Sequence, residues 1–192
     1  MLMMKRSLPE WFYPGPVGGW TADDLDDLPP EAPRRIELID GALIIMSPQA
    51  LFHQSVINHL LSAIRPPADL AVVREMDLKL GPRQRPVPDL MVVTASSTDN
   101  PDRTFFTPDE VRLVVEVVSP ESADRDRETK PPKYAKAGIR FLWRVEREGG
   151  APVAYTYELD PATGTYVATG VHRGRLKADI GFSVGIDLTI GA

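Results

Sequence analysis

Two acidic side chains fall inside the most apolar stretches of the chain, where an ionised carboxylate is costly unless a cation accompanies it. Asp89 lies in the run VPDLMVVT at residues 87–94, and Glu116 lies in VRLVVEVV at 111–118. Two such acids on adjacent strands can meet at one end of a sheet and offer the hard oxygen ligands that Mg²⁺ or Mn²⁺ prefers. A cation held there would polarise a phosphodiester and activate a water. The alternative is that each acid pairs with an Arg or Lys, or reaches water at a strand end.

A lysine next to a predicted helix is the third candidate. Lys130 directly precedes Pro131 and Pro132, and a helix accepts proline only in its first turn. We therefore expect Lys130 at the N-terminal edge of a helix near residues 131–137. There the helix dipole and the ammonium group would together attract a phosphate. The alternative is a solvated surface cation.

Three further residues are accessory candidates for the same site. Glu37 either adds a carboxylate or points outward and pairs with a neighbouring arginine. His53 is either a metal ligand or phosphate contact, or a residue that packs or caps a helix. Asp126 either caps a helical turn or pairs with Lys130. For each of the three, residue type alone favours the structural role over a catalytic one. Tyr134 is likewise expected to pack in the core rather than to stack on a base.

The chain contains 19 prolines, which fall mostly between the apolar runs and so mark the loops between the elements that must position these residues. The Asp40-Gly41 pair between two β-rich runs predicts a hairpin, and apolar spacing over residues 50–64 predicts an amphipathic helix. A short acidic helix is expected at 22–28. Further strands are expected near 70–80, 87–94, 111–118, 140–145, 153–159, 165–172 and 180–190.

Length and composition favour one folded, soluble domain. The chain has 192 residues, of which 43% are hydrophobic and 26% charged, enough to bury one core. We expect a single domain over residues 1–192, made of an N-terminal arm at 1–19, a central part at 20–146 and a C-terminal β extension at 150–192 that continues the sheet in antiparallel fashion. The chain lacks cysteine, which excludes a disulfide framework and a thiolate zinc site. No signal peptide or long apolar run is evident, so we expect a cytoplasmic protein that does not enter membranes.

Charge is unevenly distributed along the chain. The formal net charge is −5, which argues against a protein that coats nucleic acid through a bulk positive field. Residues 1–31 contain six acids and two bases, whereas residues 124–147 contain eight bases and four acids. The second segment is therefore suited to receive a polyanion, or else forms the solvated face of a helix.

The same residues resemble a known nuclease pattern. Pro88-Asp89 followed by Glu116-Val117-Val118 looks like the PD-(D/E)XK signature, with Val118 in the position that lysine usually holds. The wider pattern is similar to that of the Uma-two family, in which the lysine lies on the following helix, at the position of Lys130. The other residues that carry this resemblance are Trp20, Thr21, Asp40, Gly41, Ser47, Pro48, His53, Ser119, Pro120, Ser122, Asp126, Tyr134, Gly138 and Trp143.

This resemblance implies the restriction-endonuclease-like fold, an α/β (α+β) architecture whose mixed central sheet is flanked by helices. It implies that Asp89 and Glu116 hold Mg²⁺ or Mn²⁺, that Lys130 faces the phosphate, and that Glu37 adds a carboxylate. The expected function is a metal-dependent endonuclease, with DNA as partner and a homodimer as the expected assembly.

Two other functions compete with this one. A nucleic-acid-binding or protein-binding module that has lost catalysis is suggested by Val118. A glycoside hydrolase is poorly supported, because its acids should line an open cleft rather than buried strands.

Overall fold

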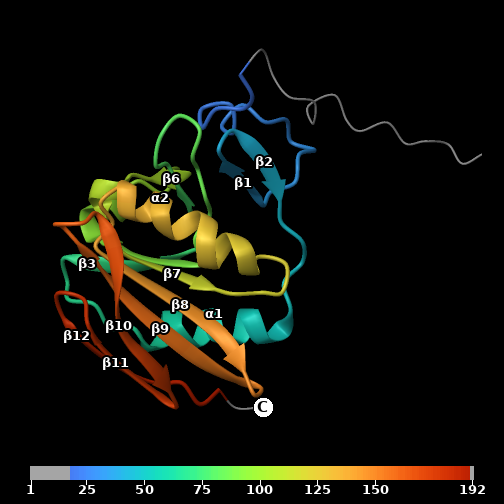
Figure 1. The fold of residues 1–192 in the computed structure, drawn as a ribbon. Helices are drawn as coiled ribbons and strands as arrows, with labels where there is room; N and C mark the ends of the chain where they lie inside the picture. Colours follow the sequence, from blue (N-terminus) through green and yellow to red (C-terminus); the bar gives the residue numbers. More distant parts are fainter. Residues whose placement is uncertain (1–17, 191–192) are drawn as a thin grey trace, which may run out of the picture.

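A six-stranded mixed sheet forms the centre of the computed structural model, which describes residues 18–190 (Figure 1). The arm predicted at 1–19 lies almost entirely outside the described residues. β7 and β8 are parallel, and every other neighbouring pair in this sheet is antiparallel. The strand order is β10 (Thr165–Arg173), β9 (Ala151–Asp160), β8 (Phe141–Glu148), β7 (Val111–Val117), β5 (Leu90–Thr94) and β3 (Leu70–Arg74).

One helix covers each face of the sheet, as Figure 1 shows for α1 (Leu51–Ala63) and α2 (Lys130–Lys136). Alternation along β7 divides its side chains between two cores. Leu113 and Val115 pack with α1, whereas Val114 packs with Tyr134 of α2. Glu116 shares the parity of Val114, so the strand directs this acid toward α2.

Smaller sheets surround the central one. The predicted hairpin is present as β1 (Ile36–Ile39) and β2 (Ala42–Ile45), and the positive φ of Asp40 (54°) and Gly41 (80°) is the backbone that its two-residue turn requires. β4 (Asp77–Leu78) pairs with β6 (Phe105–Phe106) in parallel. β11 (Arg175–Asp179) and β12 (Ser183–Asp187) form a separate hairpin that packs into the α1 core. Two 3₁₀ turns at Ala95–Thr98 and Pro108–Glu110 link the strands.

A π-helical turn at Arg125–Thr129 precedes α2 without a break. Pro131 and Pro132 have no N–H, so two carbonyls one turn earlier lack their usual α-helical donors. The N–H of Lys130 instead reaches the carbonyl of Arg125, five residues back. The wider turn accommodates the two prolines inside a continuous helical segment.

The structure corrects three expectations. The α-helix does begin at Lys130 with the prolines in its first turn, as expected, but the π turn runs into it without a break, so Lys130 does not lie beside a free helix N-terminus that could attract a phosphate. Residues 22–27 form successive turns rather than a helix, with backbone hydrogen bonds from Asp26 to Asp23 and from Asp27 to Asp24. The strand predicted at 180–190 is present as β12, but it pairs with β11 in a separate hairpin and does not extend the central sheet. β9 and β10 do extend the sheet in antiparallel fashion as predicted. No helix among residues 18–190 is long and apolar enough to cross a membrane.

Candidate active site

Lys130 lies at the centre of a buried group of carboxylates. Its Nζ is 2.8 Å from Oε1 of Glu37, 3.2 Å from Oε1 of Glu116 and 3.1 Å from Oδ1 of Asp126. The lysine side chain and each of these three acidic side chains are 2% exposed or less. The helix, the hairpin and the central sheet therefore meet at one ammonium group.

Strand register brings Asp89 to the same place. β5 and β7 are antiparallel, with Leu90 opposite Val115, so Asp89 immediately before β5 lies beside Glu116. Oδ2 of Asp89 accepts a hydrogen bond from the backbone N–H of Val117 at 2.7 Å. The predicted meeting of two strand acids at one end of the sheet is thus present in the structure.

Each strand acid has one oxygen fixed by a neighbouring side chain. Oδ2 of Asp89 is 3.2 Å from Nε2 of His53, which enters from the first turns of α1. Oε1 of Glu116 accepts a hydrogen bond from the hydroxyl of Tyr134 at 2.6 Å, in addition to its contact with Lys130. Because the donors gather on one oxygen of each acid, they orient both carboxylates.

Burial and mutual repulsion perturb the titration of the group. Burial, with repulsion from Asp126, Asp89 and Glu37, raises the pKa of Glu116 well above its ordinary value despite the attraction of Lys130. The pKa of Asp126 is also raised, chiefly by burial. Burial alone would lower the pKa of Lys130, but the attraction of Glu116, Glu37 and Asp126 raises it well above the usual range. The lysine is therefore charged, and the carboxylates outnumber it.

The donor chemistry of this group suits a hard divalent cation. Oε2 of Glu37 is buried without a hydrogen-bond partner, with the Nε of Arg125 3.9 Å away. Three carboxylates, those of Glu37, Glu116 and Asp126, share the one lysine. As arranged, no group of three His, Cys, Asp or Glu residues within 18–190 is spaced to hold a metal ion. The ammonium group occupies the space between the carboxylates, so a cation would have to displace it.

The structure therefore brings together all six residues singled out in the sequence: Asp89, Glu116, Lys130, Glu37, His53 and Asp126. The outward orientation favoured for Glu37 is wrong, because its side chain is fully buried and pairs with Lys130. Asp126 lies inside the π turn and pairs with the same lysine, so the capping interpretation is wrong too. His53 is buried against Asp89.

The sequence predicts that Tyr134 packs in the core, but it does not predict the contact of this residue with Glu116. It is indeed fully buried, but its hydroxyl points at the strand acid. The signal was available in the spacing, because Tyr134 follows Lys130 by four residues and therefore shares its helix face. Arg125 was also missed, since nothing in the sequence indicates that the π turn directs it toward Glu37.

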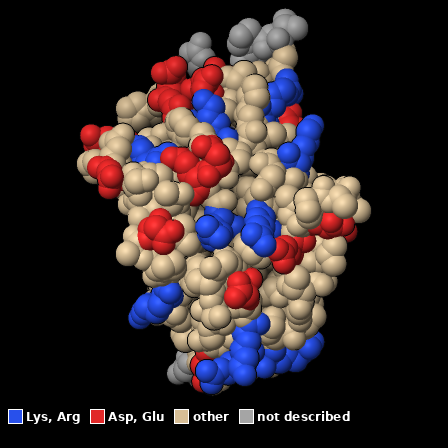
Figure 2. Space-filling model, turned by 90° about the vertical axis from the view of Figure 1, so that its left-hand side faces the viewer, with Lys and Arg blue, Asp and Glu red and all other residues tan. Residues whose placement is uncertain are grey.

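The group is closed to solvent. His53 and Asp89 have side chains only 6% exposed, and five of the main pockets within residues 18–190 are lined by other side chains. The hairpin is held to α2 by Lys130–Glu37 and by Lys133, whose Nζ is 2.7 Å from Asp40. The outer surface shown in Figure 2 carries acidic and basic side chains interspersed rather than one large positive field.

Comparison with known proteins decides the family. A family model described as "Putative restriction endonuclease" matches residues 22–191. The chain belongs to the Uma2 family. The match covers the whole hairpin, both helices and every strand of this Uma2 protein, and it confirms the resemblance inferred from the spaced motifs.

A solved structure shares the fold of this Uma2 chain. It is described as a putative nuclease belonging to DUF820 from Anabaena variabilis, and it matches with a TM-score of 0.64 and 17% sequence identity over 83% of this chain and 88% of that one. The likeness confirms the predicted restriction-endonuclease-like fold. A comparison with curated proteins gives no match.

Proposed function

We propose that this protein is a divalent-metal-dependent endonuclease that hydrolyses phosphodiester bonds in DNA. The observation that carries the proposal is the buried pairing of Asp89 with Glu116 across β5 and β7, with a charged lysine from α2 beside them. Family membership supports the same reaction class.

In this proposal Asp89 and Glu116 hold Mg²⁺ or Mn²⁺. When bound, such a cation polarises the scissile phosphate and activates a water. Lys130 adds positive charge where the phosphorane forms. His53 and Tyr134 keep one oxygen of each acid fixed, which leaves the other oxygen free to act as a ligand.

Lys130 also takes over a task that the strand cannot perform. Val118 occupies the position usual for the lysine, and its backbone N–H donates to the carbonyl of Val145 at 2.8 Å in the parallel pairing with β8. Its apolar side chain can neither orient water nor balance charge. The 3.2 Å contact between Lys130 and Glu116 supports the proposal that the helix supplies this cation instead.

The reaction consumes one water for each bond cleaved. The water oxygen forms a new bond to phosphorus, one phosphorus–oxygen ester bond breaks, and the leaving oxygen takes up a proton. Substrate access requires that the pairs between α2 and the β1–β2 hairpin open, because Lys130 and Glu37 are buried together.

The test is a cleavage assay with matched variants. Wild type, Asp89→Asn and Asp99→Asn are incubated with plasmid, single-stranded DNA and structured RNA, each with Mg²⁺, Mn²⁺ or chelator. Asp99 is an exposed acid at the end of a 3₁₀ turn and serves as the control. We expect DNA cleavage that requires the metal, persists in Asp99→Asn and is lost in Asp89→Asn. Cleavage in chelator, or equal cleavage by both variants, would contradict the assignment.

A nucleic-acid-binding module without catalysis is the second candidate. The closure of the carboxylate group and the central position of Lys130 favour it, because neither a phosphate nor a metal reaches the acids as they stand. This candidate predicts salt-sensitive DNA binding that Asp89→Asn leaves unchanged, with no cleavage under any metal condition.

A further inference from the structure

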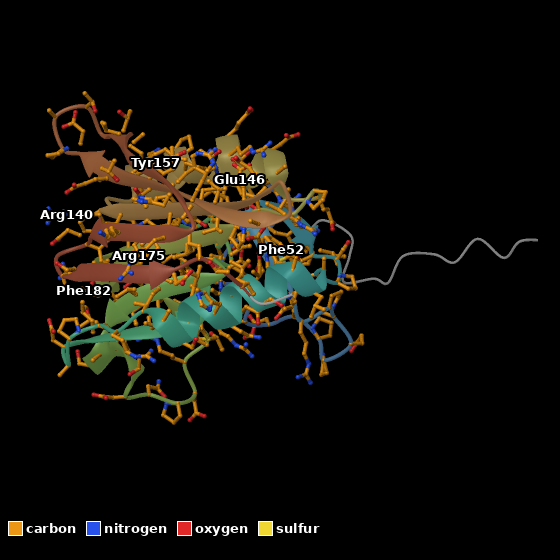
Figure 3. All side chains as sticks on the ribbon, turned by 90° about the horizontal axis from the view of Figure 1, so that it is seen from below. Phe52, Arg140, Glu146, Tyr157, Arg175 and Phe182 are labelled. Carbon is orange, nitrogen blue, oxygen red and sulfur yellow. The ribbon has the colours of Figure 1, made fainter. Side chains whose placement is uncertain are left out.

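A pocket of about 460 Å³ lies on the other side of α2, away from the buried carboxylates. Its volume is within the range of small-ligand sites. Figure 3 labels Tyr157, which lines the pocket from β9, and Glu146 on the neighbouring β8. Its lining comes from α2 and the turn before it, from β8, and from the β9–β10 hairpin, and includes Pro131, Pro132, Tyr157 and Tyr166.

Flat, rigid groups form much of the pocket wall. The hydroxyl of Tyr166 donates to the carbonyl of Ile139 at 2.7 Å, which fixes its half-buried ring. The Arg144 guanidinium lies 5.5 Å from the centre of the Tyr157 ring. Tyrosine rings, proline rings and a guanidinium plane are the surfaces on which a nucleobase stacks.

The charges at the pocket suit an anion. Arg127, Lys136 and Arg144 line it, against the single carboxylate of Glu128. Glu146 holds both guanidinium groups, with its Oε1 2.8 Å from Nε of Arg144 and its Oε2 paired to Arg127. The terminal nitrogens of Arg144 donate to no other group within the described residues, so they are available to an incoming acceptor.

We propose that this pocket binds a nucleotide, with the base against the tyrosine and proline rings and the phosphate against Arg144 and Lys136. The inference rests on the proposed function, because it assigns the pocket to one nucleotide of the strand that the carboxylates cleave. The connection is short along the chain. Lys130 belongs to the carboxylate group, and the next residue, Pro131, lines the pocket.

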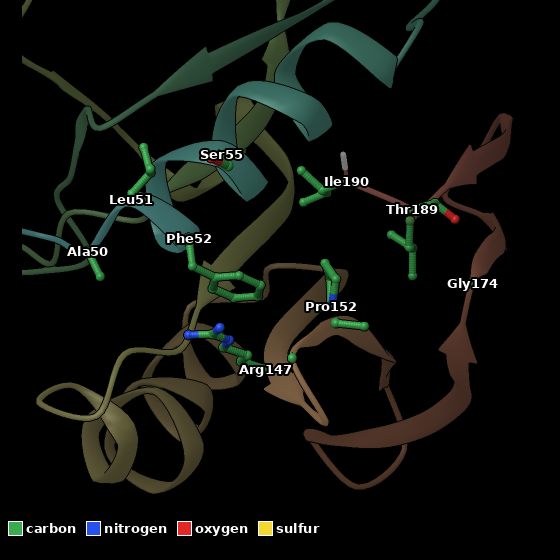
Figure 4. A pocket seen from close by; sticks show the side chains of 12 residues that line it. Ala50, Leu51, Phe52, Ser55, Arg147, Pro152, Gly174, Thr189 and Ile190 are labelled. Atoms are coloured by element: carbon green, nitrogen blue, oxygen red, sulfur yellow. The ribbon is translucent and has the colours of Figure 1, made fainter. Parts of the chain in front are cut away.

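A second pocket provides a matched control. It has a volume of about 620 Å³ and lies at the start of α1, where Phe52, Arg147, Pro152 and Ile190 line it (Figure 4). Arg147 lies 4.9 Å from the ring of Phe52, so this pocket also pairs a ring with a guanidinium. It has one aromatic ring and one cation, whereas the pocket beside α2 has two rings and three cations.

The test measures binding with catalysis blocked. The full-length protein in chelator is titrated with fluorescein-labelled oligo(dT) of eight nucleotides, and separately with thymidine monophosphate by calorimetry. We expect Tyr157→Leu to weaken oligonucleotide binding by about 5- to 150-fold, the range for losing one stacked base. Phe52→Leu should bind as wild type does.

Variants at an exposed residue guard against misfolding. Thr165 lies on the exposed rim of the pocket, so its replacement removes no core contact. Thr165→Glu should weaken binding at low salt and Thr165→Lys should strengthen it. Wild-type binding by both, or an equal loss in Phe52→Leu and Tyr157→Leu, would overturn the proposal.

The two ligands and the cleavage assay separate the remaining outcomes. Binding of thymidine monophosphate without the oligonucleotide would overturn the assignment to a strand and leave a free nucleotide as the ligand. Pocket-dependent binding without metal-dependent cleavage would refute the nuclease and support the pocket. If Tyr157→Leu and the Thr165 variants cleave DNA at the wild-type rate and bind it with the wild-type affinity, the pocket is refuted and the nuclease is supported.

Discussion

Removing the lysine from the buried carboxylates should reveal how much of the fold depends on it. Lys130 makes contacts of 2.8, 3.1 and 3.2 Å with three acids. At an effective dielectric constant of 20, each contact contributes about 5 kcal/mol of attraction, and the cost of burying four ions offsets most of the total. Loss of one partner from a buried pair costs about 3–5 kcal/mol. We therefore expect Lys130→Met to lower the free energy of unfolding by about 3–5 kcal/mol at pH 7.

The matched control lies one turn further along α2. Lys133 pairs with Asp40, whose side chain is 66% exposed. Exposed pairs contribute less than about 1 kcal/mol, so Lys133→Met should change stability by no more than that. Urea unfolding at pH 7 and pH 4, followed by the fluorescence of buried Trp143, gives both free energies by linear extrapolation.

The loss in Lys130→Met should also depend on pH. Burial raises the pKa of Glu116 and Asp126, so both carboxyls bind protons more tightly in the folded protein than in the unfolded one. Their contribution to stability therefore falls as the pH rises above about 4. In wild type, Lys130 offsets this fall because it remains charged beyond its ordinary pKa of 10.5. The difference between the two proteins should be smaller at pH 4 than at pH 7. A loss below about 1 kcal/mol at pH 7, or one that does not change with pH, would refute this reasoning.

Three further substitutions probe other contacts. Tyr134→Phe removes the hydrogen bond to buried Glu116 and should cost about 1–3 kcal/mol in urea unfolding; no change would show that the contact does not stabilise the acid. Arg85→Met leaves Asp77 without its partner at 2.7 Å and should cost about 3–5 kcal/mol, measured by thermal unfolding; a loss within 1 kcal/mol would contradict a buried pair. Leu113→Ala, at a fully buried position of β7, should cost about 2–5 kcal/mol by calorimetry, and a smaller loss would mean that the core repacks.

The sequence predicted the strands that carry the acids because their apolar runs are long. VPDLMVVT and VRLVVEVV can only be buried, and their antiparallel register then places Asp89 beside Glu116. The Asp40-Gly41 turn can also be predicted from two adjacent residues, because both adopt the positive φ angles that the turn requires. These elements are encoded over short segments and could be read from them.

The environments of Glu37 and Asp126 could not be read in this way. Both are buried by contact with Lys130. Glu37 lies 93 residues from this lysine in the sequence, whereas Asp126 lies only 4 residues from it. The sequence suggested that two prolines begin a helix. The π turn that carries the helix past them depends on a hydrogen bond from the N–H of Lys130 to a carbonyl five residues back, a rare pattern that helix propensity does not describe.

If the proposed function holds, the exclusion of the carboxylates from solvent has a consequence for the cell that makes this protein. If separating the hairpin from α2 costs about as much as losing the central lysine, 3–5 kcal/mol, then only about one molecule in a few hundred to a few thousand is open at a given moment. A chance encounter with a chromosome would almost always meet a closed protein. Damage to the host would then be limited by the scarcity of the open form, and a substrate would be cut only if it binds long enough to meet it.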